Sequence, residues 1–208
     1  MRAAIVERFG SPASGVGSTI EVVESTGSTN ADLAARAVEP GIVGTVRITT
    51  DQTSERGRHA RVWSAPAGGQ VAISVALDAG DQTEQLGWLS LATGVAAASA
   101  IESATGVRPT LKWPNDVLVP VEGDERKICG ILCEVVPGGP DGPQQVVVGI
   151  GINLSHEVAD LPVPHATSLR LVAEAAGRPA PSREEVVPAL LEALRDRLDP
   201  LDLQSVRR

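Results

Sequence analysis

The sequence predicts a mixed α/β domain whose sheet is largely antiparallel. Strand-like segments follow one another with few helical segments between them, and this order favours a mixed sheet over a doubly wound parallel one. The 208 residues are 42% hydrophobic and 21% charged, as in soluble globular domains with a buried core. The sequence shows no internal repeat and no coiled-coil pattern.

Residues 1–18 end in the run GSPASGVGS, and we expect them to form a mobile N-terminal arm. The folded domain is expected over residues 19–200. Within it, runs of aliphatic and β-branched residues bounded by turn-forming residues predict strands. These strands are expected at 19–25, 44–53, 70–77, 109–120, 126–137 and 144–155.

Three helices are expected between and after these strands. Ser28 or Thr29 is placed as an N-cap, because a hydroxyl there accepts from the free N–H groups of the first helical turn. Residues 85–103 are apolar on most faces, which predicts a helix buried against the sheet. The SREE run at 182–185 is a capping box that opens the last helix, and Pro188 should bend that helix. Its apolar side carries Val187, Leu190, Leu191, Leu194 and Leu198.

Charge and cysteine usage limit the location and partners that we expect. The formal net charge is −8, which argues against broad nucleic-acid binding and confines any anion site to a local patch. No apolar run reaches the roughly 18 residues of a membrane span, and MRAAIVERFG lacks the core of a signal peptide. We therefore expect a cytoplasmic protein without membrane contact. Cys129 and Cys133 are interpreted as reduced core thiols, because two thiols make a poor metal site.

Two residue types are rare enough to draw attention to their positions. Of 18 basic residues only two are lysines, and the chain has only three asparagines. A residue type that is scarce elsewhere is a better candidate for specific chemistry where it occurs. The positions are Lys112, Lys127, Asn30, Asn115 and Asn153.

The run VVVGIGINL places glycines on one face of a predicted strand. Because alternate residues share a face, Gly149, Gly151 and Asn153 lie together. Two interpretations stay open. The glycines either let a helix pack closely on a bulged strand, or form the floor for a flat ligand such as a nucleotide base, with Asn153 beside it. The opposite, core-facing side carries Val148, Ile150, Ile152 and Leu154.

A second polar group lies in LKWPNDVL. Pro114 cannot donate to a central strand ladder, so the chain should leave regular pairing there. Lys112, Asn115 and Asp116 would then cluster, and a lysine with a carboxylate suits a phosphate and its Mg²⁺, with Asp116 as the metal ligand. The alternative is an ordinary surface turn. Lys127, at the start of the next strand, is either a solvated strand end or a functional charge.

The loop SERGRHARVW has three arginines and a histidine within six positions. Arg56, Gly57 and Arg58 can fold over a polyphosphate, because glycine permits close backbone approach and guanidinium groups match phosphate oxygens. Trp63 can stack on a base. An arginine cluster alone also suits the acidic patch of a partner, but the accompanying tryptophan, lysines and amides favour a nucleotide site.

Five motifs resemble, in order, those of biotin protein ligases: STGSTNADL, DQTSERGRHARVW, LKWPNDVL, KICGIL and GIGINL. The run GWLSLATG resembles the corresponding helix of actinobacterial members, and the resemblance covers about residues 20–198. It implies the biotin/lipoate ligase catalytic fold, which is related to class II aminoacyl-tRNA synthetases. It also implies a two-step enzyme. Biotin and ATP, with Mg²⁺, form biotinyl-5′-AMP and diphosphate, and biotin then passes to a lysine of the biotin carboxyl carrier domain of an acyl-CoA carboxylase.

The resemblance also implies a role for each matching residue. Lys127 would bond the biotin carboxylate or its acyl-phosphate oxygen, and Asp116 would help the incoming amine. Two anions must meet in the first step, so cations must offset their repulsion. The implied biotin contacts are Ser28, Thr29, Asn30, Gln52, Arg56, Gly57, Arg58 and Lys127; the nucleotide contacts are Arg56, Arg58, Trp63, Lys112, Asn115 and Asn153; the catalytic residues are Arg58, Lys112, Asp116 and Lys127.

The sequence also departs from the family pattern. The family loop reads Gly-Arg-Gly-Arg-x-Gly-Arg, and here Glu55 and Ala60 replace two of its glycines. We expect no C-terminal β-barrel and no N-terminal helix-turn-helix, and hence no DNA-binding role. Two alternatives remain: a lipoate or octanoate transferase, against which KWPND and GIGIN argue, and a biotin- or adenylate-binding protein with impaired catalysis.

Overall fold

The computed structural model describes residues 1–9, 14–54, 68–80, 83–137, 144–161 and 163–199. Within these residues every predicted strand is present, and the segment 109–120 forms two strands because pairing breaks around Pro114. The strands are β1 (Thr19–Val22), β2 (Thr45–Thr49), β3 (Gln70–Asp78), β4 (Thr110–Lys112), β5 (Asp116–Val121), β6 (Asp124–Val136) and β7 (Gln145–Asn153).

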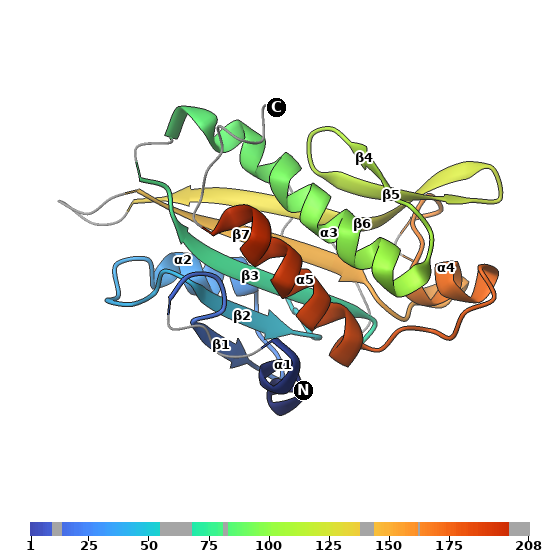
Figure 1. The fold of residues 1–208 in the computed structure, drawn as a ribbon, viewed down its shortest axis with the longest axis horizontal. Coiled ribbons are helices and arrows are strands. Elements are labelled where there is room, and N and C mark those ends of the chain that lie inside the picture. The colour runs from blue at the N-terminus through green and yellow to red at the C-terminus, as the bar shows by residue number, and fades with distance from the viewer. Residues whose placement is uncertain (10–13, 55–67, 81–82, 138–143, 162, 200–208) are drawn as a thin grey trace.

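The described strands form one seven-stranded sheet in the order β1-β2-β3-β7-β6-β5-β4 (Figure 1). β1 pairs with β2 in parallel, and every other neighbouring pair is antiparallel. This pattern confirms the predicted mixed, largely antiparallel sheet. β3, β7 and β6 occupy its centre, so side chains of these strands lie where both faces can be covered.

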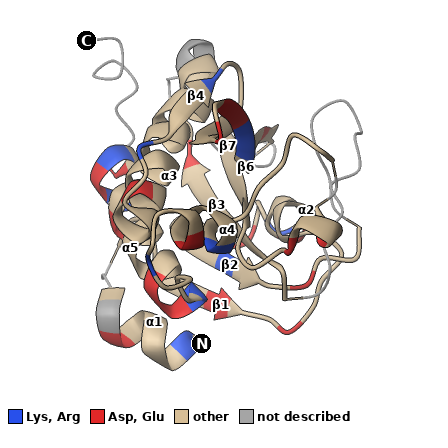
Figure 2. Cartoon of the chain, turned by 90° about the vertical axis from the view of Figure 1, so that its right-hand side faces the viewer, with Lys and Arg blue, Asp and Glu red and all other residues tan. Residues whose placement is uncertain are grey.

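Helices cover both faces of the sheet. α3 (Leu89–Thr105) and α5 (Arg183–Leu198) pack side by side on one face, and α2 (Thr29–Ala35) lies on the other (Figure 2). The main core lies between the sheet and the α3–α5 pair, which confirms the expected burial of the helix within 85–103. A 3₁₀ helix, η2 (Thr83–Trp88), precedes α3. The core-facing side of β7 and of α5 is buried as predicted, with Val148, Ile150, Ile152, Leu154, Val187, Leu190, Leu191, Leu194 and Leu198.

Helix caps follow the sequence at two of the predicted positions. Ser28 is the N-cap of α2, and Ser182 opens α5 with both hydrogen bonds of a capping box. α5 runs through Pro188, and the bend expected there stays a prediction. The sequence did not reveal α4 (Leu169–Ala175), because seven residues are too short for a helical period to stand out. A second 3₁₀ turn is η3 (Val158–Asp160).

The N-terminal segment corrects one prediction. The sequence predicts a mobile arm over residues 1–18, but Arg2–Phe9 form the helix α1, which packs against α5. Ile5 and Val16 are fully buried, and the guanidinium of Arg195 lies 4.7 Å from the centre of the Phe9 ring. The glycine-rich run misled because glycine also serves tight turns. Gly15 and Gly17 have φ angles of 78° and 85° and carry Val16 into the core.

Both cysteines are free, as predicted. Cys129 is fully buried, and burial raises the pKa of its thiol to about 12, so the thiol stays protonated at neutral pH. Cys133 is partly buried against the same core. Among the described helices, none has both the length and the apolar character that a membrane crossing requires.

Candidate functional site

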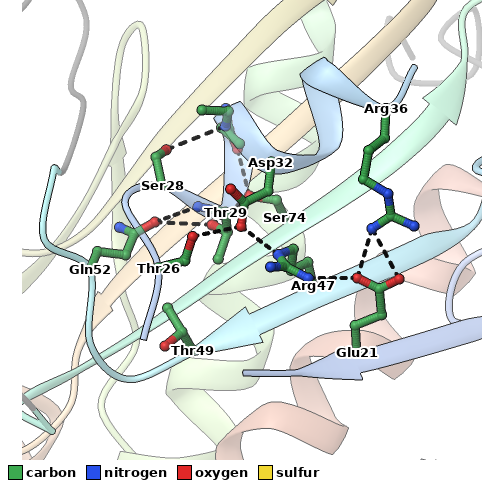
Figure 3. A network of polar contacts seen from close by, with 12 residues as sticks. Glu21, Thr26, Ser28, Thr29, Asp32, Arg36, Arg47, Thr49, Gln52 and Ser74 are labelled. Carbon is green, nitrogen blue, oxygen red and sulfur yellow. Dashed lines mark hydrogen bonds and ion pairs between the residues drawn. The ribbon is translucent and has the colours of Figure 1, made fainter. Parts of the chain in front are cut away.

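The first part of the site is the N-terminus of α2. Ser28 adopts an extended backbone conformation, and its Oγ accepts a hydrogen bond from Ala31 N at 3.4 Å. This cap places Ser28 and Thr29 at the first turn of a helix that lies across β3 and β7 (Figure 3). Both residues are buried, with 6% and 3% of their surface exposed. The predicted hydroxyl pair therefore lies inside the protein rather than on its surface.

Gln52 lies beside Thr29 because the chain extends the parallel pairing of β1 and β2. An isolated parallel bridge joins Thr26 to Gln52, and Thr53 N donates to Thr26 O at 2.9 Å. Gln52 Oε1 accepts from Thr29 N at 2.9 Å and lies 3.1 Å from Thr29 Oγ1 (Figure 3). The structure thus brings together two of the residues expected to contact biotin, although they are 23 positions apart in the sequence.

Asn30 has a different place. Its Nδ2 donates to Leu132 O at 3.1 Å and to Glu134 Oε2 at 2.8 Å, and its Oδ1 accepts from Ser74 Oγ at 2.6 Å. A Cβ at Gly149 would overlap this amide. Helix packing therefore accounts for Gly149, and Asn30 holds α2 on the sheet. Asn30 therefore supports Thr29, and its expected contact with biotin stays a prediction.

Ser74 is a site residue that the sequence did not reveal. It is completely buried in β3, on the face that α2 covers, and its Oγ lies 2.7 Å from Thr29 Oγ1 (Figure 3). The signal that could have found it is the alternation of QVAISVAL, in which Ser74 is the one hydroxyl in an aliphatic strand. A buried hydroxyl needs partners, and the partners here are two residues of the STN motif.

A charged network holds α2 at Asp32, in its first turn, and at the C-cap residue Arg36. Arg47 of β2 bonds Glu21 at 2.8 Å and Asp32 at 2.5 Å, and Arg36 bonds Glu21 at 2.9 Å (Figure 3). Burial opposes ionisation of Glu21, but the hydrogen bonds from Arg36 and Arg47 prevail and lower its pKa. Asp32 also accepts from Thr26 Oγ1 at 2.6 Å. The network ties α2 to β1, β2 and the loop that carries Ser28.

An almost side-chain-free strip crosses the sheet next to α2. Ala72 of β3, Gly151 of β7 and Gly130 of β6 are paired in one row, and the row continues to Asp116 and Lys112. Gly151 and Gly130 are partly exposed, although their strands are central in the sheet. This is the arrangement expected of a floor against which a flat ligand can lie. The ligand-floor interpretation thus suits Gly151, whereas helix packing explains Gly149.

The KWPND run forms the turn between β4 and β5. Lys112 and Asp116 are paired across it, so regular pairing ends on both sides of Pro114 as predicted. Ser90 of α3 donates to Pro114 O at 2.9 Å. Asn115 is tied to β6, with its Nδ2 donating to Ile131 O at 2.9 Å. Lys112 is exposed, and the expected contacts of Lys112 and Asn115 with the phosphates stay predictions.

Lys127 and Asp116 form an ion pair of 2.5 Å at the end of the strip. Their side chains are 19% and 24% exposed, so both remain within reach of a ligand. Among the described residues no group of three His, Cys, Asp or Glu side chains could hold a metal ion. The expected role of Asp116 as a magnesium ligand therefore stays a prediction.

A strap at residues 163–168 borders Lys127 and Asn153. Lys127 N donates to His165 O at 2.8 Å, and Thr167 N donates to Lys127 O at 2.9 Å. Asn153 is completely buried, and its Nδ2 donates to Thr167 O at 2.8 Å. Its Oδ1 has no partner among the described residues. A buried amide oxygen ordinarily has a donor, and the expected nucleotide contact of Asn153 stays a prediction.

The remaining predicted residues belong to the loop at 55–67, which lies outside the described residues. These residues are Glu55, Arg56, Gly57, Arg58 and Trp63. Their roles stay predictions. The described part of the site consists of the α2 terminus with Gln52 and Ser74, the strip at Gly151 and Gly130, the Lys127–Asp116 pair, and Asn153.

The chain is similar to several known proteins. The family model described as the biotin/lipoate A/B protein ligase family matches residues 20–153. A Mycobacterium tuberculosis relative, called biotin–[acetyl-CoA-carboxylase] ligase, is 41% identical over 184 residues, which are 86% of this chain and 64% of that protein. A Bacillus subtilis relative, called bifunctional ligase/repressor BirA, is 34% identical over 68% of this chain and 41% of its own length. The chain thus spans less than two thirds of either relative.

Solved structures show the same fold. The crystal structure of biotin protein ligase from Aquifex aeolicus matches with a TM-score of 0.66 and 25% identity, over 90% of this chain and 72% of that one. The matched family segment runs from β1 to the last residue of β7, so it contains α2, the strip, Lys127 and Asn153. Motifs, fold and relatives converge, and the chain belongs to the biotin/lipoate A/B protein ligase family.

Proposed function

We propose that this chain is the catalytic part of a biotin protein ligase, which makes biotinyl-5′-AMP from biotin and ATP and then passes biotin to a lysine of a biotin carboxyl carrier domain. One observation carries the proposal. A strip with little side-chain volume is bordered by uncharged hydroxyl and amide groups at Thr29 and Gln52, and by the Lys127 cation at its other end.

The spacing of the two ends suits an elongated ligand with a polar ring and an anionic tail. Ser74 on β3 and Asp116 on β5 are three strand spacings apart, roughly 14 Å across the sheet. The ureido ring of biotin offers two N–H donors and one carbonyl acceptor, and its aliphatic tail ends in a carboxylate. The 41% identical relative is called a biotin–[acetyl-CoA-carboxylase] ligase, which supports the same substrate and the same class of carrier.

The first step joins two anions. A carboxylate oxygen of biotin attacks the α-phosphorus of ATP, the bond from that phosphorus to the bridging oxygen breaks, and diphosphate leaves with the electron pair. Lys127 offsets the negative charge around the carboxylate and the α-phosphate, a contribution that grows as charge develops in the transition state. Lys112, exposed in the same row, adds a second cation for the phosphates.

The second step needs a base rather than a cation. The amine of the carrier lysine attacks the acyl carbon, the bond to the AMP oxygen breaks, and the amine loses a proton. Asp116, which adjoins Lys127 at 2.5 Å, is the nearest described carboxylate in this row and can accept that proton. Asn153 Oδ1, buried without a described partner, can accept from the exocyclic amine of adenine.

The test is biotin transfer by the purified chain to a carrier domain in the presence of Mg–ATP, read with streptavidin and compared with lipoate transfer. Streptavidin-reactive carrier that requires both ATP and biotin is expected. Diphosphate release without labelled carrier would indicate adenylate formation alone. Lipoate transfer, or biotin binding with neither product, would contradict the proposal.

Titration calorimetry tests the substrate separately. Biotin should bind, and lipoate, whose dithiolane ring has no N–H or carbonyl, should bind far more weakly. Polar groups left unpaired in a buried site cost about 1–3 kcal/mol each. Equal affinity for biotin and lipoate would show that Thr29 and Gln52 do not recognise a ureido ring.

A further inference from the structure

Ser74 occupies the point where α2 meets the centre of the sheet. In the strand register it lies between Arg47 of β2 and Gly149 of β7, directly below the first turn of α2. It is completely buried, and its Oγ lies 2.6 Å from Asn30 Oδ1 and 2.7 Å from Thr29 Oγ1. One hydroxyl carries one proton, so Ser74 cannot donate to both oxygens.

The orientation of Asn30 decides where that proton goes. Its Nδ2 faces the carbonyl of Leu132 and the carboxylate of Glu134, and both of these groups only accept. The Asn30 amide is therefore fixed with Oδ1 towards Ser74, where it can only accept. The Ser74 proton is committed to Asn30.

Because Ser74 donates to Asn30, the direction of the Thr29 hydroxyl proton is also defined. Two hydroxyl oxygens at 2.7 Å need a proton between them, and Ser74 has none left, so Thr29 supplies it. The other oxygen near Thr29 Oγ1 is Gln52 Oε1 at 3.1 Å, which already accepts from Thr29 N and also cannot donate. Whether Thr29 donates to Ser74 or to Gln52, its hydroxyl proton is bonded to an atom of the protein. Thr29 Oγ1 then offers a ligand lone pairs only.

Gln52 is oriented by its bond to Thr29. Its Oε1 is held by the backbone N–H of Thr29, so the remaining polar atom of its amide is Nε2, which carries donors only. The protein therefore presents one fixed acceptor at Thr29 and one fixed donor at Gln52. A cyclic urea, in which an N–H donor adjoins a carbonyl acceptor, complements that pair, whereas a ring oxygen opposite Thr29 would face another acceptor.

We propose that Ser74 is a specificity-determining positioning residue, which locks the hydroxyl of Thr29 as an acceptor and thereby selects a ring N–H. The inference rests on the proposed function, because it takes the ligand ring to be the ureido ring of biotin. Ser74 itself does not touch the ligand. It acts through two hydrogen bonds of defined direction: Ser74 donates to Asn30, and Thr29 donates to Ser74.

The test compares biotin with the two cyclic carbamates in which one or the other ureido N–H is replaced by oxygen. Titration calorimetry on the intact chain gives the dissociation constant of each ligand. The unaltered protein should bind at least one carbamate about 10-fold or more weakly than biotin, because two acceptors then face each other in a buried site. In Ser74→Ala the Thr29 hydroxyl loses its acceptor at 2.7 Å and keeps only the longer contact of 3.1 Å to Gln52 Oε1, so its proton can turn to the ligand more easily and this ratio should fall to about threefold or less.

Two further variants separate proton order from packing. Ser74→Cys keeps a weak donor and acceptor at the same atom, and its ratio should lie between those of the unaltered protein and Ser74→Ala. Thr105→Val removes another fully buried hydroxyl, one that donates to Ile101 O at 2.8 Å within α3 on the opposite face of the sheet. It should leave the ratio unchanged even if it lowers stability.

The outcomes distinguish this inference from the proposed function. If Ser74→Ala weakens biotin and both carbamates by the same factor, Ser74 only holds α2 in place and the inference is overturned. A ratio that stays at its original value in both Ser74→Cys and Ser74→Ala overturns it as well. If the unaltered chain does not bind biotin at all, the proposed function fails first, whatever Ser74 does.

Discussion

The ammonium group of Lys127 is paired with Asp116 but keeps contact with solvent. Lys127 and Asp116 are 2.5 Å apart, but 19% and 24% of their side chains remain exposed. Pairs with this much solvent contact contribute only about 0–1 kcal/mol to stability. Under the proposed function, an incoming carboxylate or phosphate would therefore compete with Asp116 for the ammonium group, and Asp116 would then be able to accept a proton in the second step.

Lys127→Ala should abolish adenylate formation while the protein stays folded. The contact strengthens as charge develops at the α-phosphate, so its loss should raise the barrier by about 2–4 kcal/mol. The measurement is diphosphate release with biotin and Mg–ATP, with circular dichroism as the check on folding. Arg183→Ala, which removes an exposed cation paired to Glu184, is the matched control and should not change the rate. Diphosphate release at the normal rate from Lys127→Ala would remove Lys127 from the mechanism.

His156 should make the stability of the protein sensitive to mild acid. Its side chain is 1% exposed, and neither ring nitrogen has a partner among the described residues. Burial lowers its pKa below the ordinary 6.5, an effect that Asp160 opposes. The unfolded chain then binds the proton more readily than the folded one, so stability is present above pH 6.5 and is lost as the pH falls towards the lower folded value.

Urea unfolding between pH 5.5 and 8 measures this effect, with His156→Gln as the comparison. The unaltered protein should lose unfolding free energy as the pH falls below 6.5, and the variant should lose less over the same interval. Parallel curves for the two proteins would show that His156 does not titrate on unfolding in this range.

At the scale of secondary-structure elements, the site depends most on the position of α2, because this helix begins at Thr29. A charged network anchors it to β1 and β2, and Asn30 anchors it to β3 and β6. Asn30 and Asp32 hold the first turn of α2, and the bond from Arg36 to Glu21 holds its C-cap; the helix has seven residues and by itself is too short to be stable. The hydroxyl of Thr29 therefore owes its position to tertiary contacts rather than to the helix.

Gly149→Ala tests that anchoring. The added Cβ would overlap the Asn30 amide, so α2 must shift or the core must strain, at a cost of about 1–3 kcal/mol. Biotin affinity should fall along with thermal stability, and Asn30→Ala in the same chain should restore part of the stability by making room. Gly87→Ala, where nothing lies within 4 Å of the new Cβ, should be neutral. Unchanged biotin binding in Gly149→Ala would mean that α2 tolerates displacement.

At the scale of the whole molecule, the features that could be predicted from the sequence are those set by hydrophobic periodicity or by residues typical of turns and caps. The strands, the α3 and α5 helices, the capping box and the break at Pro114 each depend on neighbouring residues alone. Most residues of the candidate site also lie in motifs that the scarce lysines and asparagines marked in the sequence. The missing parts depend on contacts between distant residues. The role of Ser74 can be recognised only when β3 lies under α2. The supporting role of Asn30 can be recognised only when Glu134 and Leu132 lie beside it.

The N-terminal helix is the clearest case of such a distant dependence. α1 has a weak apolar pattern and glycines after it, so local sequence does not distinguish it from a mobile arm. In the fold, Ile5 is completely buried and belongs to the main core, where α1 meets α5. A core helix and a mobile arm predict opposite effects for a single substitution there.

Ile5→Ala should therefore lower the unfolding free energy by about 2–5 kcal/mol, because it removes buried methyl groups and leaves a cavity. In a chain of this length each kcal/mol corresponds to a shift of roughly 2–4 °C in Tm. Differential scanning calorimetry measures the shift, and Ala3→Ser on the exposed side of the same helix is the control. Since the main contacts of α1 are with α5 and β1, biotin affinity below the transition should be preserved. An Ile5→Ala protein that melts at the same temperature as the unaltered chain would return residues 1–9 to the status of a mobile arm.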